Sequence, residues 1–247
     1  MPERAAIVTG ASSGIGFAVA KLLCEEGWSV TMAARRPEKL EAAHDELSRA
    51  GRDVQQVSGN LGLEEDIKRV VDAHRDAYGR CDLLMNNAGV GIGQPVAELQ
   101  TKHVDIQIST NFRSIPLFYR EAIDMLRAAG AEHRNALVVN TSSLSGKQGE
   151  AWLSVYSATK HAVIGFTQAM NKELANDGIK SCALCPGFVD TPMTDFVKGV
   201  VPAEEMITTQ DIAESVRFLL TLSPGCVVPE IVFQRPGGEL LPQASPD

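Results

Sequence analysis

The sequence is poor in the features that mark secreted, membrane-spanning and nucleic-acid-binding proteins. Its five cysteines are an odd number without a disulfide-like framework, which predicts a reduced, cytoplasmic protein. No stretch approaches the ~20 consecutive apolar residues of a membrane span, and the strand-like run near the first residue leaves no room for a signal peptide. The net charge of −8 is spread along the chain, so we expect neither a nucleic-acid nor a membrane partner.

Patterns of metal ligands are also scarce. Cys182 and Cys185 have the C-x-x-C spacing of some metal and redox sites, but they lie in the apolar run S-C-A-L-C-P. No second cysteine pair and no nearby histidine accompany them, so we predict neither a metal site nor a redox site.

The sequence does contain a regular alternation of short apolar runs with longer segments of helical period. Runs such as A-A-I-V and A-L-V-V are apolar throughout, as is typical of strands buried on both faces of a parallel sheet. The composition shows no linker and no repeat, so we predict one α/β domain over residues 1–247. Its doubly wound parallel sheet should have about seven strands, with helices on both faces. The expected strands are 5–9, 29–34, 53–58, 82–86, 136–141, 180–185 and 230–233, and the expected helices are 14–26, 37–50, 64–78, 99–129, 154–176 and 210–221.

Glycines cluster where the first expected strand ends, in T-G-A-S-S-G-I-G at residues 9–16. In doubly wound sheets ligands bind beyond the carboxyl ends of the strands, and a glycine-rich turn that opens a helix brings backbone close to a pyrophosphate. We expect a tight turn at Gly10, a close backbone approach at Gly14 and a helix–sheet contact at Gly16, although an ordinary glycine loop would look similar. The predicted dinucleotide contacts here are Gly10, Ser12, Ser13, Gly14, Ile15 and Gly16.

The end of the second expected strand bears on which dinucleotide is bound. Sites for NAD usually place an acid here to bind the ribose hydroxyls, but this strand ends in M-A-A-R-R. A guanidinium can bind a 2′-phosphate through two hydrogen bonds and can stack on adenine. We therefore predict NADP(H) in preference to NAD(H), with Arg35 as the principal contact and Arg36 beside it; the alternative is a solvated basic pair.

A tyrosine and a lysine stand four positions apart in S-V-Y-S-A-T-K-H, which begins at residue 154. If this segment is helical, Tyr156 and Lys160 share one face. The pair alone can arise by chance, so its meaning depends on the rest of the chain.

Four motifs in order resemble those of the short-chain dehydrogenase/reductase family, and the likeness covers nearly the whole chain. They are T-G-A-S-S-G-I-G at 9–16, N-N-A-G at 86–89, Ser143 with Y-S-A-T-K at 156–160, and P-G-F-V-D-T at 186–191. The resemblance implies a Rossmann fold, an NAD(P)-dependent oxidoreductase and a homodimer or homotetramer.

The resemblance also implies a catalytic set and further cofactor contacts. Ser143 lies thirteen residues before Tyr156, as is usual in the family, so we choose it over Ser142. Asn111 should fall at a helix distortion and hold a water of a proton relay, and Thr191 should bind the nicotinamide carboxamide. The implied catalytic residues are Asn111, Ser143, Tyr156 and Lys160; the implied cofactor contacts are Asn60, Leu61, Asn87, Ala88, Gly89, Tyr156, Lys160, Pro186, Gly187, Val189 and Thr191.

Some positions depart from the family pattern. Asn60 stands where an aspartate often contacts the adenine amino group, but an amide oxygen can accept the same hydrogen bond. Cys185 stands where an asparagine is common, and the run before the last strand lacks the usual glycine. The expected oligomer contact at that end is therefore open.

Carbonyl reduction would explain why Tyr156 and Lys160 lie on one face of a helix. A free phenol has a pKa near 10, and both an ammonium and an oxidised nicotinamide nearby should lower it. In carbonyl reduction hydride goes to the carbonyl carbon while Tyr156 gives its proton to the oxygen, which Ser143 stabilises by a hydrogen bond. Lys160 also binds the nicotinamide ribose, and alcohol oxidation runs the same steps in reverse.

Apolar residues predominate around the expected substrate pocket. We therefore predict a neutral or apolar ketone or aldehyde, reduced by a carbonyl reductase, although Lys147 and Lys198 could serve an anionic substrate. An acyl-carrier substrate is less favoured because no basic docking face is evident. We expect a lid over residues 191–208, an ordinary surface loop being the alternative. The expected pocket residues are Ser143, Trp152, Phe188 and Met193, with Val90, Ile92, Leu144, Leu153 and Phe196 nearby.

Other functions stay open at this point. An NAD-dependent alcohol dehydrogenase of the same fold differs only in cofactor and direction. A non-catalytic NADPH-binding sensor keeps the fold but has no need of Ser143, Tyr156 and Lys160 together. A lyase or epimerase generally needs a second substrate region, for which 247 residues leave little room.

Overall fold

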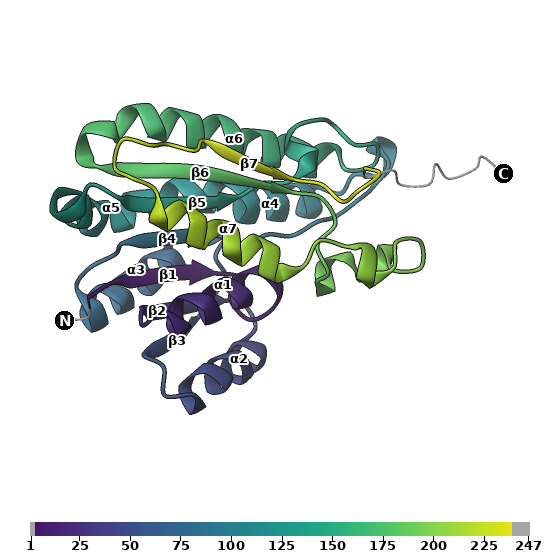
Figure 1. Ribbon diagram of the computed structural model, residues 1–247. Helices are drawn as coiled ribbons and strands as arrows, with labels where there is room; N and C mark the ends of the chain where they lie inside the picture. Colours follow the sequence, from purple (N-terminus) through teal and green to yellow (C-terminus); the bar gives the residue numbers. More distant parts are fainter. Residues whose placement is uncertain (1–2, 239–247) are drawn as a thin grey trace.

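The computed structural model describes residues 3–238, and its centre is a seven-stranded sheet in the order β3-β2-β1-β4-β5-β6-β7 (Figure 1). All six strand pairs are parallel. The outer limits of the predicted domain, residues 1 and 247, lie outside the described part. The strands are β1 (Ala5–Thr9), β2 (Ser29–Ala34), β3 (Val54–Ser58), β4 (Leu83–Asn86), β5 (Ala136–Thr141), β6 (Ile179–Pro186) and β7 (Glu230–Phe233).

Burial explains why the inner strands are apolar throughout. Every residue of β1, β2, β4, β5 and β6 is buried, whereas the edge strands β3 and β7 are only partly buried. Strands covered on both faces have no solvent side to alternate with. The edge strand β3, V-Q-Q-V-S, accordingly carries polar residues.

Helices cover both faces of the sheet, which confirms the predicted doubly wound fold (Figure 1). One core lies beneath α1 (Gly14–Glu25), α2 (Pro37–Arg49) and α7 (Thr209–Thr221). The other lies beneath α3 (Glu64–Tyr78), α5 (Ser114–His133) and α6 (Ser154–Glu173).

The predicted helix 99–129 is wrong in two respects. It is divided into α4 (Thr101–Ile108) and α5 by a π-helical turn, Ser109–Arg113. It also runs on to His133, because Gly130 is not a helix stop: a Cβ there would collide with the carbonyl oxygen of Asp177, so the glycine allows close packing. The other expected boundaries differ from the structure by at most three residues.

The segment between β6 and α7 is ordered and has a small core of its own. It contains the short 3₁₀ helices η5 (Pro192–Val197) and η6 (Ala203–Glu205), and a parallel bridge joins Val189 to Ile207. Val197, Val201 and Met206 are buried together, and Phe188 packs against them. Figure 1 shows this green segment projecting beyond the carboxyl ends of the strands.

Within residues 3–238, no helix combines the length and the apolar character that crossing a membrane requires.

Candidate active site

The residues predicted from the motifs gather at the carboxyl edge of the sheet. The glycine turn follows β1, the arginine pair follows β2 and Asn60 follows β3. Asn87 follows β4, Ser143 follows β5, and residues 186–191 end β6 and continue beyond it. Because all strands are parallel, their carboxyl ends share one edge, and the six segments converge there.

The glycine turn is shaped to admit a phosphate group. Gly10 and Gly14 have φ angles of 67° and 58°, a region that favours glycine. A Cβ on Gly16 would lie 2.7 Å from Asn87 Nδ2 and would also crowd the backbone of Gly10. At the start of α1 no side chain caps the helix and no acid occupies its first turn. Its first N–H groups therefore face the turn without a competing anion, which fits a pyrophosphate.

Arg35 and Arg36 lie exposed where β2 leads into α2. Neither guanidinium group makes a hydrogen bond or an ion pair with another residue of the described chain, although the carbonyl of Arg36 accepts from Leu40 N (3.0 Å) at the start of α2. Ala33 and Ala34, which occupy the place of the usual acid, are buried in the strand. This strand end therefore offers two unpaired guanidinium groups and no carboxylate in the strand to repel a phosphate.

Asn87 joins the ends of three strands. Its backbone N–H donates to Thr9 Oγ1 (2.8 Å), and its Nδ2 donates to the carbonyl of Thr9 (3.1 Å). Its Oδ1 accepts a hydrogen bond from Thr141 Oγ1 (3.2 Å), and Ala88 N also donates to Thr9 Oγ1 (3.0 Å). Thr9 and Thr141 were not among the predicted residues. Each is a threonine at the last position of a buried strand, which is the signal that could have identified them.

Asn111 lies buried in the π-helical turn, at the helix distortion that was expected. Its Oδ1 accepts from Val90 N (2.8 Å), and its Nδ2 donates to Val90 O (2.9 Å) and to Thr159 Oγ1 (3.2 Å). The side chain is thus engaged in fastening the segment after β4 to α6. That Asn111 holds a water of a proton relay stays a prediction.

Lys160 is buried between α6 and the end of β5. Its Nζ donates to the carbonyl of Thr141 (2.7 Å) and lies 5.5 Å from the centre of the Tyr156 ring. Burial lowers the pKa of Lys160 to about 8, because the charged ammonium is taken out of water. Gly89 lies next to it: a Cβ there would be in ordinary van der Waals contact with Nζ, at 3.7 Å.

Ser143, and not Ser142, lies beside the Tyr156 phenol. Ser143 hydrogen-bonds the phenol, whereas Ser142 Oγ donates to the carbonyl of Lys160 (2.8 Å). Burial raises the pKa of Tyr156, and the bond with Ser143 opposes that shift. The expected lowering of the phenol pKa by Lys160 is therefore not produced by the protein's own groups, since desolvation outweighs them.

The remaining predicted cofactor contacts occupy varied settings. Asn60 Oδ1 accepts from Gly62 N (3.1 Å) and keeps one lone pair free. Leu61, Pro186 and Val189 are buried, so they offer backbone rather than side chain. Thr191 caps η5 and contacts Gly14, where a Cβ would lie 3.0 Å from its methyl group.

The predicted pocket residues do not all face one cavity. Phe188 packs into the small core of the segment after β6, whereas Met193 and Phe196 are exposed. Trp152 is exposed and has a φ of 66°. Gly91, in the segment after β4, lies against the phenol, with its Cβ position 3.9 Å from Tyr156 Cε2.

The two lysines considered for an anionic substrate are paired with acids. Lys147 Nζ binds Glu230 at 2.8 Å, and Lys198 Nζ binds Asp190 at 2.9 Å and Asp195 at 2.8 Å. Within residues 3–238, no three His, Cys, Asp or Glu side chains gather in a group that could hold a metal.

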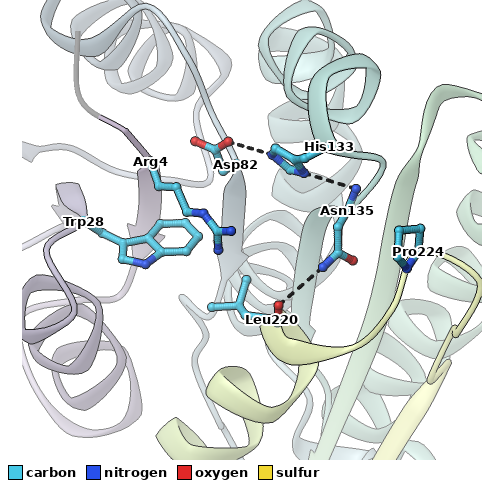
Figure 2. Close-up of a pocket in the computed structure, with 7 residues that line it drawn as sticks. All are labelled: Arg4, Trp28, Asp82, His133, Asn135, Leu220 and Pro224. Carbon is cyan, nitrogen blue, oxygen red and sulfur yellow. Dashed lines mark hydrogen bonds and ion pairs between the residues drawn. The ribbon is translucent and has the colours of Figure 1, made fainter.

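A separate cavity of about 130 Å³ lies at the opposite, amino edge of the sheet (Figure 2). Arg4, Trp28, Asp82 and Asn135 line it, and each immediately precedes a strand. Buried Asp82 accepts from Ala5 N (2.8 Å) and His133 Nε2 (2.9 Å), which ties the starts of β1 and β4 to the end of α5. None of the predicted site residues lines this cavity, and its carboxylate is engaged in holding the fold.

The geometry at the carboxyl edge agrees with comparisons to known proteins. A family model described as short chain dehydrogenase matches residues 4–199. A candidate ketoacyl reductase of Streptomyces coelicolor is 35% identical over 238 residues, covering 88% of this chain and 90% of the relative. A crystal structure of a variant actinorhodin polyketide ketoreductase with NADPH has a TM-score of 0.84 and 32% identity, covering 93% of this chain and 95% of that one. A 3-ketoacyl-(acyl-carrier-protein) reductase from Brucella melitensis, complexed with NADH, has a TM-score of 0.85 and 26% identity, covering 94% and 96%.

Proposed function

The chain belongs to the short-chain dehydrogenase family and is an oxidoreductase, and on that basis we propose that it is an NADP(H)-dependent carbonyl reductase. One observation carries the proposal. The Tyr156 phenol, the Ser143 hydroxyl and the Lys160 ammonium meet at the sheet edge where the glycine turn opens. A protein that only binds a nucleotide has no use for this combination.

The bound nicotinamide supplies the hydride that reduces the carbonyl carbon. Tyr156 donates its phenolic proton to the carbonyl oxygen, so that a ketone leaves as a secondary alcohol and an aldehyde as a primary alcohol. Ser143 donates a hydrogen bond to the same oxygen and stabilises the negative charge that develops on it. Lys160 holds a positive charge close to the phenol and favours its deprotonated form after proton transfer. The phenol is protonated at neutral pH, as the role of acid requires. Burial raises its pKa and so weakens it as an acid, and the positive charge of Lys160 acts in the opposite direction.

The nucleotide preference rests on the end of β2. Arg35, with Arg36 beside it, binds the 2′-phosphate of NADP(H), since both are exposed and unpaired within the described residues. The NADPH-bound relative supports this choice, while the NADH-bound relative shows that the fold itself does not decide it. The further contacts are those of the glycine turn, of Asn60 and Leu61, of Asn87 to Gly89, and of Pro186, Gly187, Val189 and Thr191.

The substrate is a neutral or apolar ketone or aldehyde. The pairing of Lys147 and Lys198 with acids supports this class, because neither is free to bind an anion. A second candidate is a 3-ketoacyl group, which the names of two relatives favour. Turnover of acetoacetyl-coenzyme A compared with that of an uncharged ketone separates the two.

Further parts of the proposal concern the whole chain. We propose one domain over residues 1–247, a lid over residues 191–208, a cytoplasmic location and a homodimer or homotetramer. An apolar groove of about 410 Å³ between α4 and α6 supports self-association. Sedimentation equilibrium measures the subunit number directly.

Replacement of Tyr156 by phenylalanine tests the reaction itself. We expect Tyr156→Phe to lose at least a hundredfold in NADPH-dependent ketone reduction, the size of a general-acid contribution. Its dissociation constant for NADPH, measured by nicotinamide fluorescence, should change little. Full activity in the variant would refute the role of the phenol. A wild-type protein that binds NADPH without reducing any ketone would support the sensor instead.

A further inference from the structure

Trp152 combines two unusual properties, a left-handed backbone and an exposed aromatic side chain. Within residues 3–238 only Trp152 and Arg134 have positive φ without being glycine, and Arg134 ends α5 in a helix cap. Trp152 has a φ of 66°, and 64% of the residue's surface is exposed to solvent. Bulky residues rarely adopt this conformation, and such outliers cluster at ligand sites.

The backbone of Trp152 is held firmly beside the catalytic tyrosine. Its carbonyl accepts a hydrogen bond from Gln94 N (2.7 Å), in the segment after β4. The same segment borders the phenol through Gly91, and Gln94 itself is held by His103 Nδ1 (2.8 Å). The indole is therefore carried by a fixed loop four residues before Tyr156.

Exposed apolar side chains are concentrated around this edge. Of the ten large apolar residues that are exposed in the described chain, five lie on the segments that follow β4, β5 and β6. Single exposed apolar residues are normal on a monomer, but half of those exposed here fall on the three segments that border the candidate site, as a binding surface at that edge would require. The five are Val96, Trp152, Met193, Phe196 and Val200.

We propose that Trp152 determines substrate specificity, by presenting its indole as a flat surface for an aromatic or similarly planar group attached to the reacting carbonyl. The inference rests on the proposed carbonyl reduction and narrows its substrate class to aryl ketones and aldehydes. The tie to Gln94 holds the backbone in its unfavourable conformation, so the direction in which the side chain leaves the loop is set and less freedom is lost on stacking. Aromatic pairs favour offset or edge-to-face contact, which selects a planar partner over a small aliphatic one.

The test compares 2-acetonaphthone with 2-butanone as substrates with NADPH, in the wild type, Trp152→Gly and Trp152→Phe. Glycine adopts a φ of 66° without strain, so Trp152→Gly removes the ring and keeps the backbone; its melting temperature should equal or exceed that of the wild type. We expect the ratio of kcat/KM for the aryl ketone to that for 2-butanone to fall about tenfold in Trp152→Gly, mainly through KM, the size of one aromatic contact. Trp152→Phe should retain most of the ratio. An unchanged ratio in Trp152→Gly, or an equal loss in Trp152→Phe, would overturn the proposal.

A binding measurement separates this inference from the proposed reaction. The chain has two tryptophans, and Trp28 is 5% exposed at the opposite edge of the sheet. In a Trp28→Phe background the emission comes from Trp152, and 2-acetonaphthone should quench it saturably while 2-butanone does not. Saturable quenching without turnover of either ketone would support the indole site and refute the reductase. Absence of saturable quenching would overturn the indole site even if the ketone is reduced.

Discussion

Replacement of Lys160 by methionine should stabilise the protein while removing its activity. The buried ammonium has its pKa lowered from 10.5 to about 8 by desolvation. At ~1.4 kcal/mol per pKa unit, this difference costs the folded state about 3 kcal/mol when both states are protonated. Methionine removes that cost with a side chain of similar length. It also removes the hydrogen bond from Nζ to Thr141 O (2.7 Å). The loss of that bond should cancel about 1–2 kcal/mol of the gain in stability. The net gain should be about 1–2 kcal/mol at pH 7.

The sign of the pH dependence follows from the same shift. Below pH 8 the lysine is protonated in both states, and the full desolvation cost is present. Between pH 8 and 10.5 the folded state has lost the proton that the unfolded state still carries, so the wild type gains stability as the pH rises. The advantage of Lys160→Met should therefore shrink through this window.

Urea denaturation of wild type and Lys160→Met at pH 7 and pH 10 measures both effects, with turnover recorded on the same preparations. Lys102→Met is the matched control, since Lys102 is exposed; it should leave stability within about 0.5 kcal/mol at either pH. A Lys160→Met protein less stable than wild type at pH 7, or an advantage that persists undiminished at pH 10, would refute the reasoning.

Two further predictions concern the nucleotide. Gly16→Ala should lower NADPH affinity and stability, because its Cβ would crowd Asn87 and the backbone of Gly10. The control Gly165→Ala has open space around it and should gain about 1 kcal/mol of stability from helix propensity. Fluorescence titration and urea denaturation of both variants check this, and equal effects in the two would contradict it. Arg35→Ala should raise the dissociation constant for NADPH about tenfold and that for NADH much less. Parallel titrations decide the matter, and an equal change for both nucleotides would remove Arg35 from the 2′-phosphate site.

The sheet and the positions of the motifs could be predicted from the sequence because short local patterns of residues determine them. An apolar run such as A-L-V-V in β5 predicts a buried parallel strand when the segments on either side have a helical period and glycines separate them from it. A parallel sheet then brings its strand ends together whatever the details of packing. The gathering of the glycine turn, Ser143 and Tyr156 at one edge followed from this topology.

What escaped prediction depends on contacts between distant residues. Thr9 and Thr141 acquire a role only because Asn87 lies between their strands. Gly130 lies inside α5 because the carbonyl of Asp177 leaves no space for a side chain there, a contact that no local pattern reveals. The effect of burial on the pKa of Tyr156 was not foreseen either, because the sequence shows the neighbouring charge of Lys160 and not the loss of water around the phenol.

The strand order also determines when the nucleotide site comes into existence as the chain folds. Ala6 in β1 pairs with Leu83 in β4, and no pair in the sheet is a hairpin. Each strand pairing must therefore close a long loop, a slow process for parallel topologies. The glycine turn gains its support only when Asn87 and Thr141 arrive from β4 and β5, since Asn87 donates to the carbonyl of Thr9 and accepts from Thr141. We therefore expect nucleotide affinity to appear only after the centre of the sheet, with β1, β4 and β5 paired, has formed.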